Sequence, residues 1–332
     1  MDFKNYLEII QQEISLSEIE AYELMRDVTE GKFTEVQSTA LIILLSTRNI
    51  SLNELKGFRD SLLQLALKVN LNDFDCIDLC GTGGDGKNTF NISTLSSFIV
   101  AGAGYHVAKH GNYGVSSISG SSNVLENLGY KFSTDENIFK QELEYCKITF
   151  MHAPLFHGAL KNVASIRKQI GTKTLFNMLG PLINPAQPKR QFTGVYNLKL
   201  ARMYHYLFEQ EEKIHAVVHS VDGYDEITLT KAAQIYSHEG EFILEAEDFN
   251  MKRNNESDLF GGNTLEEAKI IFVSVLSNEG TEAQTNTVIA NAAIAIKCYE
   301  PNKSLIDCIE IARESLQSLK AKKSLENLLS IF

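Results

Sequence analysis

The stretch from Gly81 to Thr94 combines residue types and spacing that suit phosphate binding. It is rich in glycine, follows an apolar run over 74–79 that predicts a buried strand, and precedes an apolar run over 94–103 that predicts a helix. A glycine loop between a strand and a helix presents backbone N–H groups and a helix N-terminus to an anion. Asp85, inside this loop, would repel a bare pyrophosphate, so we expect it to bind ribose hydroxyls or a metal that holds the phosphates.

The same loop matches the dinucleotide fingerprint G-x-G-x-x-G only in part. Gly81, Gly83 and Gly86 have the required spacing, but the fingerprint also needs an acidic residue about 20 positions further on. The segment 105–112 at that distance has no acid, and no Gly-Lys-Ser or Gly-Lys-Thr follows as in a P-loop. We therefore disfavour a nicotinamide or flavin site, and a glycine turn without a ligand is the other alternative.

A second polar loop follows the next predicted strand, 105–109. It begins with Lys109 and Asn112, and Gly120-Ser121-Ser122 follows closely before a predicted helix. Loops after neighbouring parallel strands line one crevice at the carboxyl edge of the sheet. We expect Lys109 to supply a point charge there, in preference to being a solvated surface lysine, and Asn112 to hydrogen-bond a substrate amine or carboxylate.

Two further segments carry charged groups that suit the same ligand. Asp225 and Glu226 come shortly after an apolar predicted strand, 214–219, and adjacent carboxylates suit Mg²⁺ that also binds substrate phosphates. An acidic surface turn is the alternative. Arg167 lies in a helical pattern over 157–168, where its guanidinium could pair with a carboxylate or simply belong to an exposed basic face.

Composition excludes several classes of protein. The 332 residues carry a net charge of −11, which argues against binding to nucleic acid or an anionic membrane. The first residues show no signal-peptide pattern, and no apolar run approaches the length of a membrane span. The five cysteines form no C-x-x-C pair, which predicts buried free thiols in a reducing, cytoplasmic compartment rather than a zinc site or disulfides.

The pattern of elements predicts an α/β fold in two parts. Residues 1–70 predict a small all-helical domain with three capping boxes, at Ser17, Thr34 and Ser51, which helices from 156–188 would join. Residues 71–155 and 189–332 predict a larger α/β domain with a mostly parallel central sheet flanked by helices. The predicted strands are 74–79, 105–109, 147–152, 191–196, 214–219, 226–229 and 269–275, and the predicted helices include 119–128, 136–145, 200–210, 264–268 and 280–299.

Taken together, these motifs resemble the anthranilate phosphoribosyltransferase family, within the nucleoside-phosphorylase-like transferases. The resemblance runs in order along nearly the whole chain. Its main stretches are Gly-Thr-Gly-Gly-Asp at 81–85, Asn-Ile-Ser-Thr at 91–94, Lys-His-Gly-Asn at 109–112, Ser-Gly-Ser at 119–121, His157 with Arg167, the run 176–185, Asp225-Glu226, Gly261-Gly262 and Asn291-Ala292-Ala293. The resemblance implies transfer of the phosphoribosyl group of phosphoribosyl pyrophosphate (PRPP) to the amine of anthranilate, with Mg²⁺, in a homodimer formed through the helical part.

The resemblance also implies roles for individual residues. It assigns PRPP binding to Gly81, Gly83, Gly84, Asp85, Thr89, Asn91, Ser93, Thr94, Lys109, His110, Gly111, Asn112 and Ser121. It assigns anthranilate binding to Gly81, Asn112, His157, Arg167 and Gly180, and the metal to Ser93, Asp225 and Glu226. No residue is implied as a nucleophile or a general base.

The chain departs from the family pattern in the second loop. Tyr113-Gly114 stands where the family usually has Arg-Ala, Ile118 stands for a lysine, and Ser122-Asn123 stands for Ala-Asp. Two cations and one acid are therefore missing near the expected phosphates. The alternatives kept open are a pyrimidine-nucleoside-phosphorylase-type enzyme, a relative with another aromatic amine as acceptor, and a non-catalytic or nucleic-acid-binding relative.

Overall fold

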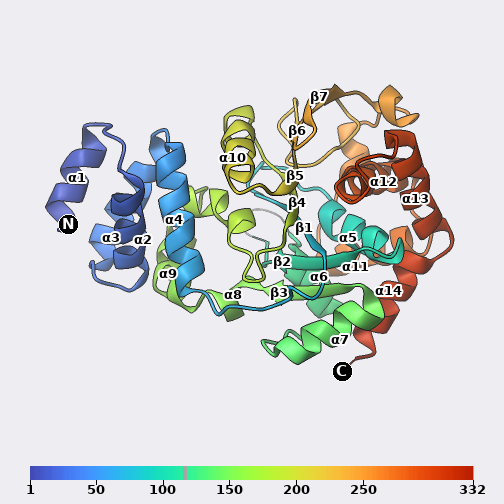
Figure 1. Ribbon diagram of the computed structural model, residues 1–332, viewed down its shortest axis with the longest axis horizontal. Helices are drawn as coiled ribbons and strands as arrows, with labels where there is room; N and C mark the ends of the chain where they lie inside the picture. The colour runs from blue at the N-terminus through green and yellow to red at the C-terminus, as the bar shows by residue number, and fades with distance from the viewer. Residues whose placement is uncertain (115–117, 332) are drawn as a thin grey trace. The chain divides into compact units, whose positions relative to one another are not determined.

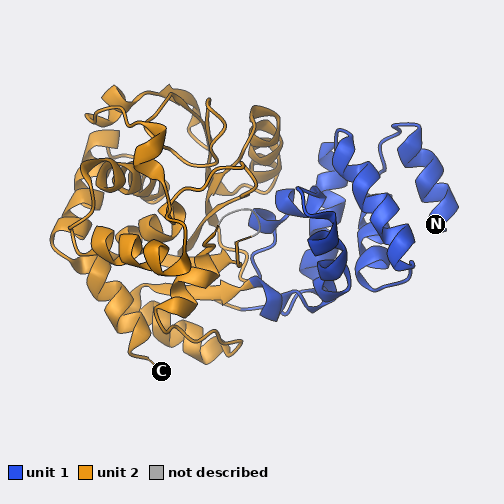
Figure 2. Cartoon of the chain, turned by 180° about the vertical axis from the view of Figure 1, so that it is seen from behind, with its two compact units in different colours: residues 1–69, 153–185 blue, residues 70–152, 186–332 orange. Residues whose placement is uncertain are grey.

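The chain divides into two compact units (Figure 2). The computed structural model describes residues 1–114 and 118–331. Unit 1 comprises Met1–Val69 and Ala153–Pro185, and unit 2 comprises Asn70–His152 and Ala186–Phe332.

Unit 1 is built from helices. Its described elements are α1 (Phe3–Gln11), α2 (Glu18–Thr29), α3 (Glu35–Thr47), α4 (Leu52–Leu65), α8 (Ala153–Phe156) and α9 (Lys161–Ile170), with short 3₁₀ segments at Gly158–Leu160, Leu175–Met178 and Gly180–Leu182. The three predicted capping boxes are confirmed, because the side chains of Ser17, Thr34 and Ser51 each accept the backbone N–H of the third helical residue and their own backbone N–H groups donate to that residue's side chain. The helices α2 and α4 pack closely at Gly57, where a Cβ atom would lie 2.9 Å from the Cβ of Ala21.

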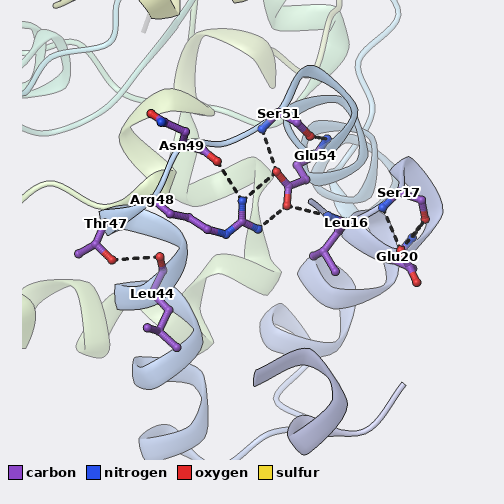
Figure 3. A network of polar contacts seen from close by, with 9 residues as sticks. All are labelled: Leu16, Ser17, Glu20, Leu44, Thr47, Arg48, Asn49, Ser51 and Glu54. Carbon is purple, nitrogen blue, oxygen red and sulfur yellow. Dashed lines mark hydrogen bonds and ion pairs between the residues drawn. The ribbon is translucent and has the colours of Figure 1, made fainter. Parts of the chain in front are cut away.

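A buried ion pair ties three parts of unit 1 together (Figure 3). The carboxylate of Glu54 accepts the backbone N–H of Leu16 at 3.0 Å and that of Ser51 at 2.8 Å, and it pairs with both terminal nitrogens of Arg48. Burial by itself would raise the pKa of Glu54, but these hydrogen bonds outweigh it and the pKa is lowered. The carboxylate therefore stays charged and paired, as a buried charge must.

Unit 2 is built on a mixed seven-stranded sheet (Figure 1). Its spatial order is β3-β2-β1-β4-β5-β6-β7. The strands are β1 (Cys76–Gly81), β2 (His106–Gly111), β3 (Ile148–His152), β4 (Arg190–Gly194), β5 (Ile214–Ser220), β6 (Ala233–Ser237) and β7 (Gly240–Leu244). The first five strands are parallel, and β6 and β7 add an antiparallel hairpin at one edge.

Helices cover both faces of this sheet. The described helices of unit 2 are α5 (Ile92–Gly102), α6 (Ser121–Asn127), α7 (Glu136–Cys146), α10 (Leu198–Gln210), α11 (Leu265–Leu276), α12 (Glu282–Lys297), α13 (Leu305–Gln317) and α14 (Lys320–Leu329). The helix α5 connects β1 to β2 and α7 connects β2 to β3, so the chain moves toward the β3 edge of the sheet. The helix α10 connects β4 to β5, so there the chain moves in the opposite direction. Because such crossovers are right-handed, α5 and α7 cover one face and α10 covers the other. The helix α5 is buried among α12, α13 and α14 on its face (Figure 1).

Two of the predicted strands are wrong. Residues 269–275 belong to α11, and this helix buries Ala268, Phe272 and Val275 but exposes Ile270 and Val273. That spacing is helical, so packing of one face overrides the strand preference of a β-branched run. Residues 226–229 form no strand because the side chain of Asn291 takes both backbone groups of Ile227, at 3.0 and 2.7 Å.

Other elements were not foreseen from the sequence. The hairpin of β6 and β7 and the helices α13 and α14 were missed. The remaining predicted strands are confirmed to within two residues at each end, and the predicted α/β class with a mostly parallel sheet is confirmed.

Candidate functional site

The glycine loop lies at the point in unit 2 where the direction of chain winding changes. Strands β1 and β4 are neighbours at the centre of the sheet, and Gly81 at the end of β1 pairs with Gly194 at the end of β4. The connection after β1 leads toward β2, and the connection after β4 leads toward β5 on the other side. Open α/β sheets bind ligands outside the carboxyl ends of the strands at such a switch point.

Two glycines make room for Asp225 at this point. A Cβ atom at Gly194 would collide with the backbone carbonyl of Asp225, and one at Gly81 would collide with its carboxylate. The segment after β5 therefore crosses directly over the ends of β1 and β4. Gly194 was missed in the sequence, where it is one glycine at the end of an apolar run.

The loop itself needs glycine for its backbone conformation. Gly83, Gly84 and Gly86 have φ angles of +60°, +73° and +77°. A Cβ atom at Gly83 or Gly86 would meet nothing within 4 Å, so conformation rather than space requires glycine at these two positions. The backbone N–H of Gly83 donates to the carboxylate of Asp225 at 2.7 Å, which joins the loop to the acidic segment.

Three carboxylates from two segments come together here. Asp85 and Asp225 interact directly, and Glu226 accepts the backbone N–H of Ser93 at 2.9 Å, at the start of α5. Burial, followed by the charge of Asp85, raises the pKa of Asp225 to about 7. Burial, followed by the charge of Asp225, raises the pKa of Glu226 well above its usual range. Like charges held together in a buried place favour a cation among them.

The donor set fits a magnesium ion that is shared with a phosphate ligand. Within residues 1–114 and 118–331, no three or more His, Cys, Asp or Glu side chains are grouped so as to hold a metal by themselves. Mg²⁺ is usually bound through one or two carboxylates together with waters and substrate phosphates, rather than in an all-protein cage. Asp225 and Glu226 supply such a pair, and Ser93 adjoins it through its backbone.

Lys109 lies beneath the loops rather than at their surface. Its side chain is 1% exposed, and its ammonium donates to the backbone carbonyl of Leu79. Burial lowers the pKa of Lys109, while the nearby charges of Asp78, Cys80 and Glu226 oppose that effect. We expected Lys109 to present its charge at the end of β2. The structure instead places the ammonium group behind the ends of β1 and β2, near the charges of Asp78 and Glu226.

The loop after β2 is tied to the start of α6. His110, which follows Lys109, is buried, and its backbone N–H donates to the carboxylate of Asp78 at 3.2 Å. A Cβ atom at Gly111 would collide with Ser121 and with the ring of Phe150. The hydroxyl of Ser121 donates to the backbone carbonyl of Asn112 at 3.4 Å. The structure thus brings His110, Gly111, Asn112 and Ser121 into one connected group.

The remaining residues predicted for this region lie along the start of α5. Thr89 forms a β-bridge with Phe260, and Asn91 donates from its side-chain amide to the carbonyl of Ser119 at 3.0 Å. Thr94 is 1% exposed and therefore belongs to the packed first turn of α5. Asn91 thus links the two loops, whereas Thr94 faces the interior.

The other predicted residues belong to unit 1. His157 is buried, and burial lowers the pKa of its imidazole to about 4, so it is neutral near pH 7. Arg167, on α9, places its guanidinium 5.2 Å from the ring centre of Phe176, and burial lowers its pKa. Gly180 begins a 3₁₀ segment, and a Cβ atom there would meet nothing within 4 Å.

The departures from the family pattern have defined surroundings where the structure describes them. Tyr113 packs edge-on against His152 with ring centres 4.7 Å apart. Asn123 accepts hydrogen bonds from Gly114 and Gly120, and Ser122 bonds to His152 at 2.8 Å. Ile118 is 40% exposed. Residues 115–117 of the same loop lie outside the described part of the chain.

Comparison with known proteins identifies the family of both parts of the chain. Residues 73–322 match the α/β domain of a glycosyl transferase family, and residues 4–66 match the helical bundle domain of the same family. The chain is 49% identical to the anthranilate phosphoribosyltransferase of Flavobacterium psychrophilum over 98% of both chains. It is 48% identical to that of Bacteroides thetaiotaomicron over 94% of both.

Solved structures agree with this assignment. The crystal structure of anthranilate phosphoribosyltransferase from Thermus thermophilus superimposes with a TM-score of 0.90 at 30% identity, over 98% of each chain. The Saccharomyces cerevisiae enzyme, solved in complex with PRPP and Mg, shares the fold with a TM-score of 0.88 at 22% identity, over 98% of this chain and 96% of that one. The chain therefore belongs to the anthranilate phosphoribosyltransferase family of glycosyl transferases.

Proposed function

We propose that this chain transfers the phosphoribosyl group of PRPP to the amine of anthranilate, which gives N-(5-phosphoribosyl)anthranilate and pyrophosphate in tryptophan biosynthesis. The observation that carries the proposal is the meeting of Asp85, Asp225 and Glu226 with a glycine loop at the switch point of the sheet. Acids that repel one another beside a glycine loop suit a ligand that brings both phosphates and a divalent cation.

The PRPP site is assigned to the two loops and the start of α5. Gly83, with its positive φ and open space at the Cβ position, can bring backbone N–H groups close to a phosphate. The full assignment is Gly81, Gly83, Gly84, Asp85, Thr89, Asn91, Ser93, Thr94, Lys109, His110, Gly111, Asn112 and Ser121. Within this set, Lys109 acts from behind the strand ends, where its charge offsets that of the carboxylates.

The metal site is assigned to Ser93, Asp225 and Glu226. When Mg²⁺ is bound there, it neutralises charge on the departing pyrophosphate. The carboxylates of Asp225 and Glu226 are held in place by the N–H groups of Gly83 and Ser93, so they are oriented before any ligand arrives.

The reaction needs positioning and charge stabilisation more than a catalytic base. The bond from ribose C1 to the pyrophosphate oxygen breaks, and its electron pair leaves with pyrophosphate. The lone pair of the neutral amine forms the new C1–N bond, and the amine then loses one proton to solvent. Backbone N–H groups of the glycine loop stabilise the departing anion, and fixed placement of the two reactants lowers the barrier further.

Anthranilate is assigned to Gly81, Asn112, His157, Arg167 and Gly180. Arg167 carries the positive charge that the substrate carboxylate needs, and its guanidinium is already oriented over Phe176. His157 is neutral near pH 7 because burial lowers its pKa to about 4, so it offers hydrogen bonding without a charge. Gly180 leaves open space at the position of a side chain.

A homodimer formed through the helical part is proposed as well. Unit 1 exposes large apolar side chains on three helices or their flanks, namely Ile14, Ile19, Val36 and Ile43. An interface between two copies would cover exposed apolar side chains of this kind. Sedimentation of the wild type against Val36→Glu tests the assignment, and an unchanged mass would count against it.

The cell compartment proposed is the cytoplasm. All five cysteines are free and buried, which suits a reducing compartment. Within the described part of the chain, no helix combines the length and apolar character that a membrane crossing requires.

The decisive experiment follows anthranilate fluorescence with purified protein, PRPP and Mg²⁺, and with each component omitted in turn. Loss of signal only in the complete mixture supports the proposal. No loss, with PRPP still binding by calorimetry, would redirect the search to another aromatic amine. Phosphate-dependent release of base from uridine or thymidine would instead favour a nucleoside phosphorylase.

The acceptor assignment has its own test in Arg167→Ala, with Lys168→Ala as the matched control on the same helix. We expect the KM for anthranilate to rise about tenfold or more while the KM for PRPP stays within about twofold, since a charge-assisted contact to one substrate is lost. Equal loss for both substrates would place Arg167 elsewhere.

A further inference from the structure

We propose that Asn123 is a positioning residue whose side-chain carbonyl clips together Gly114 and Gly120, and thereby fixes Asn112 and Ser121 for the phosphates of PRPP. The role of Asn112 and Ser121 rests on the proposed function. The clip itself rests on hydrogen bonds and close contacts among described residues on either side of 115–117.

The carbonyl of Asn123 is the meeting point of two backbone donors. It accepts the N–H of Gly114 at 2.9 Å and the N–H of Gly120 at 3.0 Å. Two donors on one atom identify that atom as the oxygen of the amide, because the amide nitrogen cannot accept. One side chain therefore satisfies backbone groups that are six residues apart in sequence.

Close packing leaves this arrangement little freedom. A Cβ atom at Gly120 would collide with the nitrogen of Gly114 and would lie 2.7 Å from the carbonyl oxygen of Asn112. The N–H of Ser122 donates to that same carbonyl at 3.1 Å, and the hydroxyl of Ser121 donates to it at 3.4 Å. The residues flanking the loop are thus in direct contact, and Asn112 and Ser121 are joined to each other.

Neighbouring side chains hold α6 but do not replace the clip. Tyr113 reaches Glu126 at 3.3 Å and packs on His152, and His152 stacks on Phe132 with ring centres 4.5 Å apart. These contacts join Tyr113 to the last turn of α6 and to His152 at the end of β3. The N–H groups of Gly114 and Gly120 depend on Asn123, so its removal loosens the base of the loop while the helix stays packed.

The neutrality of Asn123 also matters for an anionic ligand. A carboxylate at this position would accept the same two hydrogen bonds but would add a negative charge close to Ser121. Asn123→Asp therefore separates the two contributions, because it keeps the clip and changes only the charge. We expect its effect on PRPP binding to shrink as salt rises, whereas the effect of a lost clip is insensitive to salt.

The test compares Asn123→Ala and Asn123→Asp with Asn127→Ala, a control on the same helix whose side chain bonds to Leu265 instead. Amide hydrogen exchange of the ligand-free proteins is measured first. We expect faster exchange at Gly114 and Gly120 in Asn123→Ala only. In steady-state assays, Asn123→Ala raises the KM for PRPP about tenfold, while kcat and the KM for anthranilate stay within about threefold.

The outcomes are distinct. Faster exchange and a selective rise in the KM for PRPP in Asn123→Ala, both reversed in Asn123→Asp at high salt, support the proposal. Wild-type exchange and KM in Asn123→Ala overturn it, as does an Asn123→Asp variant that exchanges as fast as Asn123→Ala. A wild type without turnover refutes the proposed function instead, and the exchange comparison still decides whether Asn123 is a clip.

Discussion

The two ends of the central sheet in unit 2 differ in how their charged groups are arranged: opposite charges pair at the amino end, and like charges gather at the carboxyl end. At the amino end, Arg190 at the start of β4 binds the carboxylate of Asp75 at 2.8 to 3.1 Å and lies 4.6 Å from the ring centre of Tyr299. The hydroxyl of Tyr299 donates to the carbonyls of Asp75 and His106. At the carboxyl end, burial and the charge of Asp85 raise the pKa of Asp225, and burial and the charge of Asp225 raise the pKa of Glu226.

This difference separates stability from function along one sheet. The amino end joins the starts of β1, β2 and β4 through opposite charges and satisfied carbonyls, so it contributes to folding. The carboxyl end keeps carboxylates in mutual repulsion and requires glycine at Gly81 and Gly194, so it costs stability, which the proposed cation and phosphates would offset. Substitutions at the two ends should therefore have opposite consequences.

The largest effect is expected from neutralising the carboxyl end. Asp225→Asn combined with Glu226→Gln should lower kcat about a hundredfold or more and raise the Mg²⁺ requirement, because the proposed ligands of the metal are lost. The same change should raise the melting temperature, since it removes like charges from a buried place. Unchanged Mg²⁺ dependence would refute the metal assignment. A lower melting temperature would refute the inference that like charges at the carboxyl end of the sheet cost stability.

Removing the charge of Arg190 at the amino end should lower stability and leave activity unchanged. Arg190→Met should lower the free energy of unfolding by about 2–3 kcal/mol, through loss of the hydrogen bonds to Asp75 and Cys298 and of the contact with Tyr299. Both KM values should stay within about twofold, because the site lies at the other end of the strands. Chemical denaturation measures the first, and Arg313→Met, which breaks an exposed pair with Glu310, is the control.

The pH dependence of stability should distinguish the two ends as well. Because the folded state raises the pKa of Asp225 from 3.8 to about 7, it holds a proton that the unfolded chain has already released. The free energy of unfolding should therefore fall as pH rises across that window, by of the order of 4 kcal/mol, and Glu226, whose pKa is also raised, adds to the fall. Denaturation in metal-free buffer should give a smaller slope for Asp225→Asn with Glu226→Gln.

A second buried acid, Glu142, also contributes to the pH dependence of stability, and its contribution must be measured separately. Glu142 on α7 accepts hydrogen bonds from Tyr130 and Thr149, and burial raises its pKa to about 7. Its contribution has the same sign, so the pH series should be repeated in a Glu142→Gln background. If the slope of the wild type vanished with Glu142→Gln alone, the carboxyl end of the sheet would not be its source.

The smallest effect concerns a single hydroxyl at the amino end. Tyr299→Phe should lower the free energy of unfolding by about 1 kcal/mol, because two backbone carbonyls lose a donor while the ring keeps its stacking on Tyr105 at 4.7 Å. Arg190 keeps its aromatic partner in this variant. A loss as large as that of Arg190→Met would assign the stability of this end to Tyr299 rather than to the guanidinium.

Local chemistry made much of the molecule predictable from the sequence. The capping boxes at Ser17, Thr34 and Ser51 form because the residues involved are three positions apart on the chain. The glycine loop could be recognised because glycine adopts positive φ, as at Gly83 and Gly84, without the steric cost that a side chain brings. Alternation of apolar runs and helical patterns predicted the mostly parallel sheet, since each pattern reports which faces are buried.

Contacts between distant segments were decided only by the tertiary structure. Gly194 needs to be glycine because Asp225 crosses it, and Ile227 leaves the sheet because Asn291 takes its backbone groups. Lys109 turned out to be buried behind the strands, and residues 269–275 turned out to be helical because one face packs into the core. Residue type and spacing determined which groups could do the chemistry, whereas the fold decided which of them face one another, because long-range packing leaves no periodic signal in the sequence.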